Sequence, residues 1–409
     1  MSGLGIALRL LVIVTVVIVE AARTLPAVGA RLLVNRANAK RRWYQGLVRV
    51  IQTLGPTFVK FGQIAGTRRD ALPAGLCDEL GTLHDRVAPM PWSMAERVLR
   101  EAQRRQPALV IQEIDQVPVG SGSIACVYRA RLADGRQVAV KLKRPDIDRR
   151  MRTDLALLRG LVRLAERTPA MRGMPVADLV GYVSEAILQQ LDFAQEAKNL
   201  AILREAVAAF PEVRVPVLYD ELSGPDCLVF EFIDGLDVST PETLSAECRA
   251  RLGAAVLAAA HQMIFVRGFV HCDLHPGNLY LTKDEQVVIL DAGYCVQLPA
   301  RVRDLIGEFF GRLARGDGKR CGEIILESAV VLGTPEEQQA FVDDVAALVA
   351  RSAGPGKTFD MPTFGNEIFA LQQRYHLYAE SDFAFPLMSL LVLKARWPAL
   401  WRQGNFRRG

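Results

Sequence analysis

The chain has 409 residues, which is long enough for two lobes and an extension around a sizeable core. Half of its residues are hydrophobic and 23% are charged, a composition that excludes disorder on the scale of a domain. The net charge is +5, but ten lysines and arginines lie between Arg23 and Arg69 without a single acid. Such a basic block suits an anionic membrane surface or nucleic acid, and we expect the membrane because nothing else resembles a nucleic-acid module. The seven cysteines form no C-x-x-C pair and are typical of reduced cytosolic thiols.

An apolar segment, residues 4–19, directly precedes the basic block. As a helix it would be roughly 24 Å long, short of the ~30 Å hydrocarbon core of a bilayer. It could span if Arg9 snorkels and Ala21 and Ala22 are included. The alternatives are a helix that lies in the membrane plane or packs on the protein, and a cleaved signal peptide. If the segment spans, the basic block predicts that the rest of the chain is cytoplasmic.

Residues 40–110 are expected to be helical, with breaks at Pro56, Pro73 and Pro89-Met90-Pro91. The helix predicted over residues 57–68 carries two stripes. One stripe is apolar and consists of Phe58, Phe61 and Ala65; the other is polar and consists of Lys60, Gln63 and Thr67. By itself, a polar stripe of this kind indicates a solvated surface.

From Val117 the pattern changes to period two and predicts strands, with a turn at Asp134-Gly135. The loop Gly120-Ser121-Gly122-Ser123 lies between two of these strands, so its backbone amides can approach a phosphate closely. In isolation it would be an ordinary hairpin. Lys141 ends the sequence Val-Ala-Val-Lys, where a kinase places the lysine that reaches the α- and β-phosphates of ATP. A lone lysine in a strand usually faces solvent.

A long helix is predicted over residues 178–208. Asp192, Glu196 and Asn199 lie at i, i+4 and i+7, so we expect them on one face of this helix. Glu196 is our candidate for the ion-pair partner of Lys141. The alternative is a solvated acidic face.

The sequence from His271 to Asn278 carries the strongest signal. A kinase catalytic loop uses an Asp that accepts the hydroxyl proton and an Asn five positions later that holds magnesium, and Asp273 and Asn278 have this spacing. Asp291, which follows a predicted hairpin, is the candidate second magnesium ligand. Together with Lys141 these residues predict ATP and Mg²⁺ as cofactors. A strand over residues 227–233 and a helix over 241–267 precede the loop, and everything after Pro299 is predicted to be helical.

One other motif resembles a phosphate-binding loop. Gly354-Pro-Gly-Lys-Thr358 ends like a Walker A loop, but Arg351 stands where the first glycine belongs and no strand precedes it. We interpret it as a surface loop.

With these motifs in place, residues 45–330 resemble the UbiB family of atypical kinases, the aarF-domain proteins. Lys60-Phe61-Gly62-Gln63 is similar to the KxGQ signature of that family, which ordinary kinases lack. The sequences Leu191-Asp192-Phe193 with Glu196, and His271 to Asn278, resemble its helix motif and its catalytic loop. The resemblance implies that Lys60 and Gln63 are regulatory and lie on a helix that folds across the nucleotide site.

The resemblance also implies an ATP-binding, magnesium-dependent protein of prenyl-quinone biosynthesis, with ATPase activity expected before protein-kinase activity. Three departures are visible. The alanine-rich loop of the family carries Gly120 and Gly122 here, Gln190 replaces an acidic residue so that Asp192 must pair with Lys60, and the DFG-like triplet is Asp291-Ala-Gly. The family's pair of C-terminal hydrophobic spans is also not evident, because residues 383–393 are too short.

We therefore predict an α+β, two-lobed protein-kinase-like fold with an N-terminal helical extension that carries the KxGQ motif. The predicted parts are an anchor candidate (1–22), the extension (23–110), the N-lobe (111–235) and the helical C-lobe (236–409). The expected partners are ATP, anionic membrane lipid and quinone-biosynthesis enzymes, without nucleic acid, at the cytoplasmic face of the inner membrane. Two alternatives stay open: a small-molecule phosphotransferase of the aminoglycoside or choline kinase type, and a nucleotide-gated scaffold.

Overall fold

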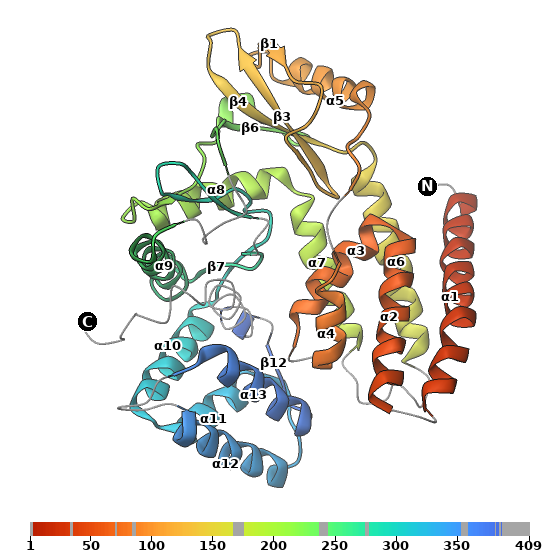
Figure 1. Cartoon of the computed structure of the whole chain (residues 1–409), viewed down its shortest axis with the longest axis vertical. Helices are drawn as coiled ribbons and strands as arrows, with labels where there is room; N and C mark the ends of the chain where they lie inside the picture. The colour runs from red at the N-terminus through yellow and green to blue at the C-terminus, as the bar shows by residue number, and fades with distance from the viewer. Residues whose placement is uncertain are drawn as a thin grey trace. The chain divides into compact units, whose positions relative to one another are not determined.

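The computed structural model describes residues 3–32, 36–69, 72–83, 87–166, 176–236, 244–274, 278–352, 359–380, 382–383 and 386. The chain divides into two compact units, Met1–Phe193 with Tyr219–Phe230, and Ala194–Leu218 with Glu231–Gly409 (Figure 1). Both units contain helices and strands, so the α+β class is confirmed. The C-terminal hydrophobic segment after Phe383 and the loop of residues 354–358 fall almost wholly outside the described residues.

The first unit begins with four helices: α1 (Gly3–Leu32), α2 (Arg36–Leu54), α3 (Pro56–Thr67) and α4 (Ala74–Leu80). Pro56 opens α3, Pro73 directly precedes α4, and Pro91 directly precedes α5 (Trp92–Arg105). Proline suits these positions because its fixed φ fits the first turn, where its missing N–H is not needed. The predicted breaks are therefore confirmed.

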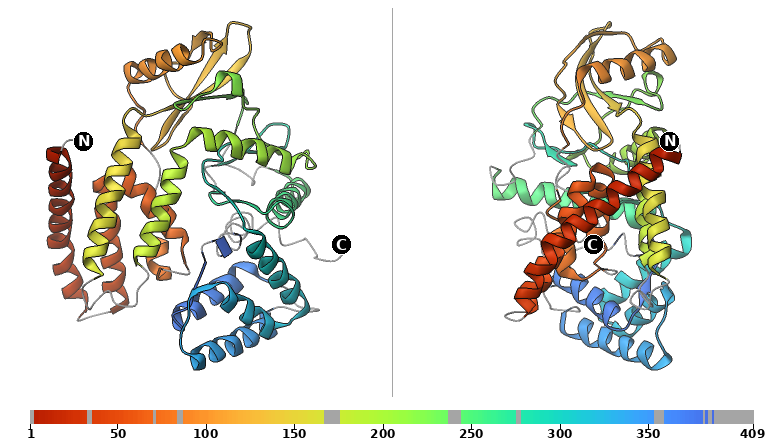
Figure 2. Two further views of the ribbon diagram at one scale, coloured as in Figure 1. Left: turned by 180° about the vertical axis from the view of Figure 1, so that it is seen from behind. Right: turned by 90° about the vertical axis from the view of Figure 1, so that its right-hand side faces the viewer.

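Helix α1 is longer than the apolar run that predicts it. It continues past Val19 to Leu32 because the charge at Glu20 is accommodated: its carboxylate accepts from Arg23 at 2.8 Å and from Arg49 on α2 at 3.2 Å. In Figure 2, α1 lies across the helical layer that α2 and α6 (Ile147–Ala165) form. Ile13 of α1 packs with Leu54 and Phe58 in a small core.

The sheet of the first unit consists of β1 (Ile111–Ile114), β2 (Gly120–Ser121), β3 (Ala125–Leu132), β4 (Gln137–Lys143) and β6 (Cys227–Glu231). The strand order is β1-β3-β4-β6, and β2 pairs with β3. Alternate side chains of β3 and β4 face the core, as a period of two requires, and pack with α5. The fully buried members are Cys126, Tyr128, Val138, Val140 and Leu142. A 3-10 turn, η2 (Asp220–Leu222), precedes β6.

The long helix predicted over residues 178–208 is two helices, α7 (Val176–Gln190) and α8 (Phe193–Val207). The break falls at Leu191 and Asp192. The carbonyl of Leu191 accepts a hydrogen bond of 2.7 Å from Lys143 Nζ. In a continuous helix this oxygen would accept from a backbone N–H one turn later. Sequence periodicity does not report such a donor, which is why the prediction was wrong here.

The second unit contains short strands and helices. Its strands are β5 (Val213–Arg214), β7 (Phe269–His271), β8 (Leu279–Leu281), β9 (Val287–Ile289), β10 (Cys295–Gln297), β11 (Ala329–Val331) and β12 (Tyr378–Ala379). Its helices after α8 are α9 (Ala246–His261), the π-helical turn η3 (Gln262–Val266), α10 (Ala300–Arg315), α11 (Gly318–Glu327), α12 (Pro335–Ser352) and α13 (Met361–Arg374). The predicted hairpin is β8–β9, and β7 pairs with β10. Strands β11 and β12 interrupt a region that was predicted to be entirely helical.

Candidate active site

The candidate catalytic loop leaves β7 at His271, whose side chain is buried. The backbone N–H of Asp273 donates to His271 Nδ1 at 3.2 Å, and Asn278 Nδ2 donates to the carbonyl of Asp273 at 2.8 Å. Asn278 therefore folds back onto the loop, and its Oδ1 is left as the atom suited to a cation. Residues 275–277 lie outside the described residues. Asp273 and Asn278 are thus brought together, as their spacing predicts.

Asp291 is tied to the same histidine. His271 Nε2 lies 2.6 Å from the carbonyl oxygen of Asp291, and Asp291 Oδ1 accepts from the N–H of Gly293 at 2.7 Å. Because Nδ1 of His271 already accepts a hydrogen bond, the proton of the neutral ring belongs on Nε2, which donates to Asp291. A single buried imidazole thus links the two segments that carry the acidic candidates.

Helix α8 supports this arrangement from the other side. Asn199 Nδ2 donates to the carbonyl of Ala292 at 2.9 Å, and both Glu196 and Asn199 are buried. Asp192 lies outside α8 and is exposed, so it does not share their face as the periodicity predicted. The break at Leu191 accounts for this difference. The predicted Lys141–Glu196 ion pair joins residues of different units and stays a prediction.

The thiol of Cys295 reports the electrostatics of this region. Burial raises its pKa well above the ordinary value of 9.0, and its neighbour Cys272 and three carboxylates raise it further; these are Asp291, Glu196 and Asp273. The carboxylates of Asp291, Glu196 and Asp273 therefore all contribute negative potential at this buried thiol.

The residues present fit a magnesium ion. Mg²⁺ prefers oxygen ligands and usually combines one or two protein ligands with waters and substrate phosphates. Asn278 Oδ1 and the carboxylate of Asp291 supply ligands of this type. In the described part of the chain, no group of three or more His, Cys, Asp or Glu side chains converges as a metal site. A magnesium site with two protein ligands does not need such a group, because phosphates complete its coordination.

The predicted nucleotide loop lies in the first unit. Gly120 and Ser121 form β2, and the N–H of Gly122 donates to the carbonyl of Ala125 at 2.9 Å. Ser123 is buried. Ser121 Oγ donates to the carbonyl of Val87 at 2.8 Å, so this hydroxyl bonds the protein's own chain. The expected strand–turn–strand geometry is confirmed.

Lys141 is half-buried, and its Nζ lies 5.4 Å from the ring centroid of Phe193. Sequence reasoning missed its neighbour Lys143, which points to the same face of β4 and is buried. Lys143 Nζ lies 4.8 Å from the same ring and 3.5 Å from Asp148 Oδ2. One aromatic ring therefore contacts two lysines, of which the sequence singled out one.

The KxGQ motif is not solvated, unlike the surface its polar stripe alone suggested. Lys60 is buried, and Gln63 Nε2 donates to the carbonyl of Leu83 at 3.3 Å. Gly62 permits this packing, because a Cβ there would approach Leu83 Cδ1 at 2.5 Å. Thr67, the third member of the stripe, is exposed. Gln190 is buried, and its Nε2 has no hydrogen-bond partner among the residues that the structure describes.

Comparisons with known proteins identify the family of this chain. A model of the ABC1 atypical kinase-like domain matches residues 82–325. A Synechocystis protein, slr0889, is 30% identical over 73% of this chain and 76% of its own length. Probable protein kinase UbiB of Pseudomonas aeruginosa is 32% identical over 84% of this chain and 66% of its own length. The Arabidopsis thaliana chloroplastic protein ACTIVITY OF BC1 COMPLEX KINASE 7 is 29% identical over 84% of this chain, which spans 49% of that relative.

A solved structure shares the fold. The Mycobacterium tuberculosis protein Rv3197, determined with erythromycin, superposes with a TM-score of 0.53 over 83% of this chain and 87% of its own. The identity is 21%, so this likeness concerns the fold alone. The family model and the two relatives that are 30% and 32% identical lead to one conclusion. This chain belongs to the UbiB family of proteins with an ABC1 atypical kinase-like domain.

Proposed function

We propose that the protein binds ATP with Mg²⁺ and transfers or hydrolyses its terminal phosphate as an atypical kinase or ATPase. The observation that carries this proposal is the histidine link: His271 bonds both the Asp273 backbone and the Asp291 carbonyl. A merely structural loop has no need to gather an Asp, an Asn and a second Asp around one buried imidazole.

Each residue has a role in the proposed reaction. Asn278 and Asp291 would hold magnesium, which neutralises phosphate charge when it is bound. Lys141 would contact the phosphates, with Glu196 as its partner. Asp273 would orient the attacking hydroxyl or water and accept its proton. The glycine loop would contact the phosphates through backbone amides.

ATP hydrolysis is favoured over protein phosphorylation. Lys60 on α3 is buried, and Gln63 is bonded to Leu83, so the helix that bears the KxGQ motif is packed in place. In the family resemblance this helix covers the region where a peptide substrate would lie. The same resemblance supports a role in the synthesis of prenyl-quinones or related isoprenoid lipids.

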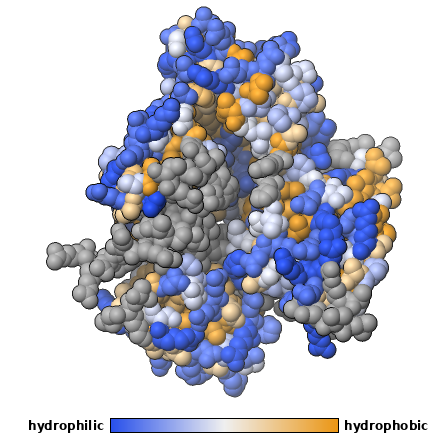
Figure 3. All heavy atoms as spheres, viewed as in Figure 1, coloured by the Kyte–Doolittle hydropathy of each residue, from blue (hydrophilic) through white to orange (hydrophobic). Residues whose placement is uncertain are grey.

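The protein is proposed to act at the cytoplasmic face of the inner membrane, with α1 as the attachment. Residues Gly5–Gly29 are long and apolar enough to cross a bilayer, with a mean hydropathy of 2.3, although core helices and signal sequences share these properties. Only 11% of that window is buried. Hydrophobic residues gather at the edge where α1 lies (Figure 3). The most exposed of them are Leu8, Leu11, Ile18 and Leu25.

The opposite face of α1 is tied to the protein by charge. Arg9 Nε and Nη2 donate to the two carboxylate oxygens of the buried Asp154 at 2.6 and 2.8 Å, and Arg9 Nη2 also donates to the carbonyl of Leu54. Glu20 pairs with Arg49. A spanning helix would carry both Arg9 and Glu20 into hydrocarbon without these partners, which is unfavourable. These contacts support an attachment in which α1 lies along the membrane surface.

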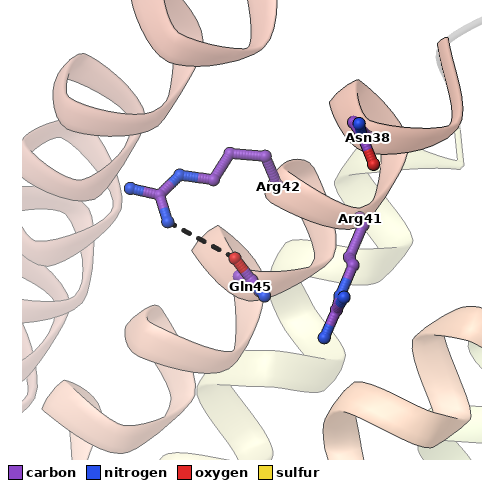
Figure 4. A pocket seen from close by; sticks show the side chains of 4 residues that line it. All are labelled: Asn38, Arg41, Arg42 and Gln45. Atoms are coloured by element: carbon purple, nitrogen blue, oxygen red, sulfur yellow. Dashed lines mark hydrogen bonds between the residues drawn. The ribbon is translucent and has the colours of Figure 1, made fainter. Parts of the chain in front are cut away.

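Basic groups of α2 suit an anionic lipid headgroup. A polar hollow of about 400 Å³ on this helix is lined by Asn38, Arg41, Arg42 and Gln45 (Figure 4). Arg42 Nη1 donates to Gln45 Oε1 at 3.3 Å, while Arg41 bonds Glu79. Positive charge beside an apolar helix is typical of surfaces that bind anionic bilayers.

The activity is tested by nucleotide turnover with purified full-length protein, with and without Mg²⁺ and vesicles that contain anionic lipid. We expect magnesium-dependent ATP hydrolysis that Asp291→Asn abolishes and that Asp304→Asn, an exposed change on α10, leaves intact. Absence of turnover under every condition would contradict the proposal. Phosphate transfer to a soluble hydroxyl compound would favour a small-molecule phosphotransferase instead.

The membrane attachment is tested by sedimentation with the same vesicles. Ile18→Glu should abolish binding, whereas Leu164→Glu should not, although both side chains are 61% exposed. A surface-bound helix should be released by alkaline carbonate. Protein that resists carbonate would contradict the in-plane arrangement, and binding that survives Ile18→Glu would exclude α1 as the attachment.

A further inference from the structure

Arg144, the first residue after β4, contacts the nucleotide loop through its guanidinium. Its Nε donates to the carbonyl of Gly122 at 2.9 Å, and its Nη2 donates to Ser121 Oγ at 2.9 Å. The backbone N–H of Arg144 also donates to the carbonyl of Ile124 at 2.8 Å. Arg144 therefore contacts two residues of the loop and the residue that follows it.

The same guanidinium holds a second segment of the chain. Arg144 Nη2 donates to the carbonyl of Ala88 at 2.8 Å, and Ser121 Oγ donates to the carbonyl of the adjacent Val87 at 2.8 Å. Val87 and Ala88 follow the helices α3 and α4 and precede α5. The hydroxyl of Ser121 donates to the carbonyl of Val87 and accepts from Arg144. It therefore helps to join the loop to the segment of Val87 and Ala88.

The bond to Gly122 has a consequence for the loop amides. The peptide between Gly122 and Ser123 is trans, because the described residues contain no cis peptide bond. In a trans peptide the C=O and N–H groups point in opposite directions. The carbonyl of Gly122 faces Arg144, so the N–H of Ser123 points away from Arg144. The guanidinium thereby fixes the direction of one loop amide.

We propose that Arg144 is a positioning residue that holds the glycine loop in its nucleotide-binding conformation and ties it to the segment after α4. The inference rests on the proposed nucleotide site. It gives the Ser121 side chain a structural role, beside the phosphate contact that the sequence predicts for the backbone amides of the loop. Glycines leave a loop conformationally free, and binding to a free loop requires that the loop be ordered first. Arg144 supplies that order before the nucleotide arrives.

The first experiment separates affinity from chemistry. In the full-length protein, Arg144→Gln should raise the KM for ATP about tenfold, as loss of loop order weakens binding, while kcat stays within about twofold. Arg144→Lys should recover part of the loss, since lysine can donate to one of the loop acceptors. Arg131→Gln is the matched control, because Arg131 is an exposed arginine of the same sheet and should leave KM unchanged. An unchanged KM in Arg144→Gln, or a loss confined to kcat, would overturn the proposal.

The second experiment needs no nucleotide, so it also applies if the protein does not turn over ATP. Hydrogen exchange of peptides that cover residues 120–125 should accelerate at least severalfold in Arg144→Gln and less in Ser121→Ala, with β4 unaffected. Ser121→Ala removes the bond to Val87 and should leave the sheet intact. It therefore tests the tether even if the arginine variants fold poorly. Exchange rates in the loop that match those of the wild type would refute the positioning role. Absence of ATP turnover with accelerated exchange would refute only the proposed function.

Discussion

The imidazole of His271 lies 2.6 Å from the carbonyl oxygen of Asp291, while its other nitrogen accepts the N–H of Asp273. The two acidic candidates are therefore positioned by one buried side chain, which bonds their backbone groups rather than their carboxylates. Since both ring nitrogens are used, the neutral tautomer with the proton on Nε2 is the one that fits.

His271→Phe should lower kcat for ATP hydrolysis by about 10- to 100-fold, because it keeps the ring volume and removes both hydrogen bonds. Nucleotide affinity should change less, since Lys141 and the glycine loop lie in the other unit. The control is His261→Phe, in which an exposed histidine of α9 is replaced by the same residue. Wild-type kcat in His271→Phe would show that the histidine link is dispensable.

The sequence contains enough information to predict the fold class, the helix breaks at the prolines and the grouping of Asp273 with Asn278. These depend on local periodicity, on proline chemistry and on spacing within one loop. The break at Leu191 and the burial of Lys60 could not be predicted in the same way. The first depends on Lys143, which is 48 positions away in the chain. The second depends on the tertiary packing of α3, in which Gly62 lies against Leu83. The sequence pattern of β4 would be the same whether the amine of Lys143 bonded water or a backbone carbonyl. His271 stood inside the recognised motif, but its bond to Asp291 joins residues 20 positions apart and depends on the tertiary fold.

Gly62→Ala should destabilise the protein by about 1–2 kcal/mol, because the new Cβ would crowd Leu83 and Ile51. The side chain of Leu83 is buried, so it has little free space into which it could turn away. Gly160→Ala is the opposite case: nothing lies within 4 Å of a Cβ there, so the change should stabilise α6 by roughly 0.5–1 kcal/mol. Urea unfolding of both variants measures the difference. Equal effects of the two changes would mean that the KxGQ glycine is not a packing requirement.

Arg9→Met should destabilise the protein by about 3 kcal/mol, because Asp154 is buried and would lose a two-bond partner. The double variant Arg9→Met with Asp154→Leu should recover much of this loss, since no buried charge is then left unpaired. Arg136→Met provides the comparison. Its 2.7 Å pair with Asp134 is exposed, so its removal should lower the free energy of unfolding far less than Arg9→Met does. Similar losses from Arg9→Met and Arg136→Met would indicate that α1 is not docked on the buried carboxylate.

Stability should decline as the pH rises above about 9, in part because of Cys227. Burial raises the pKa of this thiol to about 12 in the folded protein, with a smaller contribution from Asp226, against an ordinary value of 9.0. Between these values the unfolded chain loses its proton and the folded chain keeps it, so rising pH favours unfolding by up to about 1.4 kcal/mol per unit. Urea unfolding at pH 8 and pH 10 measures the decline. Cys227→Ala should make it shallower, and an identical slope would exclude this thiol as a contributor.

Lys141 and Lys143 stand two positions apart on β4 beside the same ring of Phe193, yet they should behave differently when replaced. Lys141→Met should abolish nucleotide turnover while the free energy of unfolding changes by less than about 1 kcal/mol, because a half-buried amine at the predicted phosphate position serves binding. Lys143→Met should destabilise the protein by about 1.5–3 kcal/mol, since the buried ammonium bonds the Leu191 carbonyl at 2.7 Å where α7 ends. Turnover should fall less in Lys143→Met than in Lys141→Met, because Lys143 bonds the chain at Leu191 and is not the predicted phosphate lysine. Thermal unfolding and ATP hydrolysis of the two variants, measured side by side, separate the roles. If Lys143→Met were fully stable and inactive while Lys141→Met stayed active, the assignment of the phosphate lysine would have to move to Lys143.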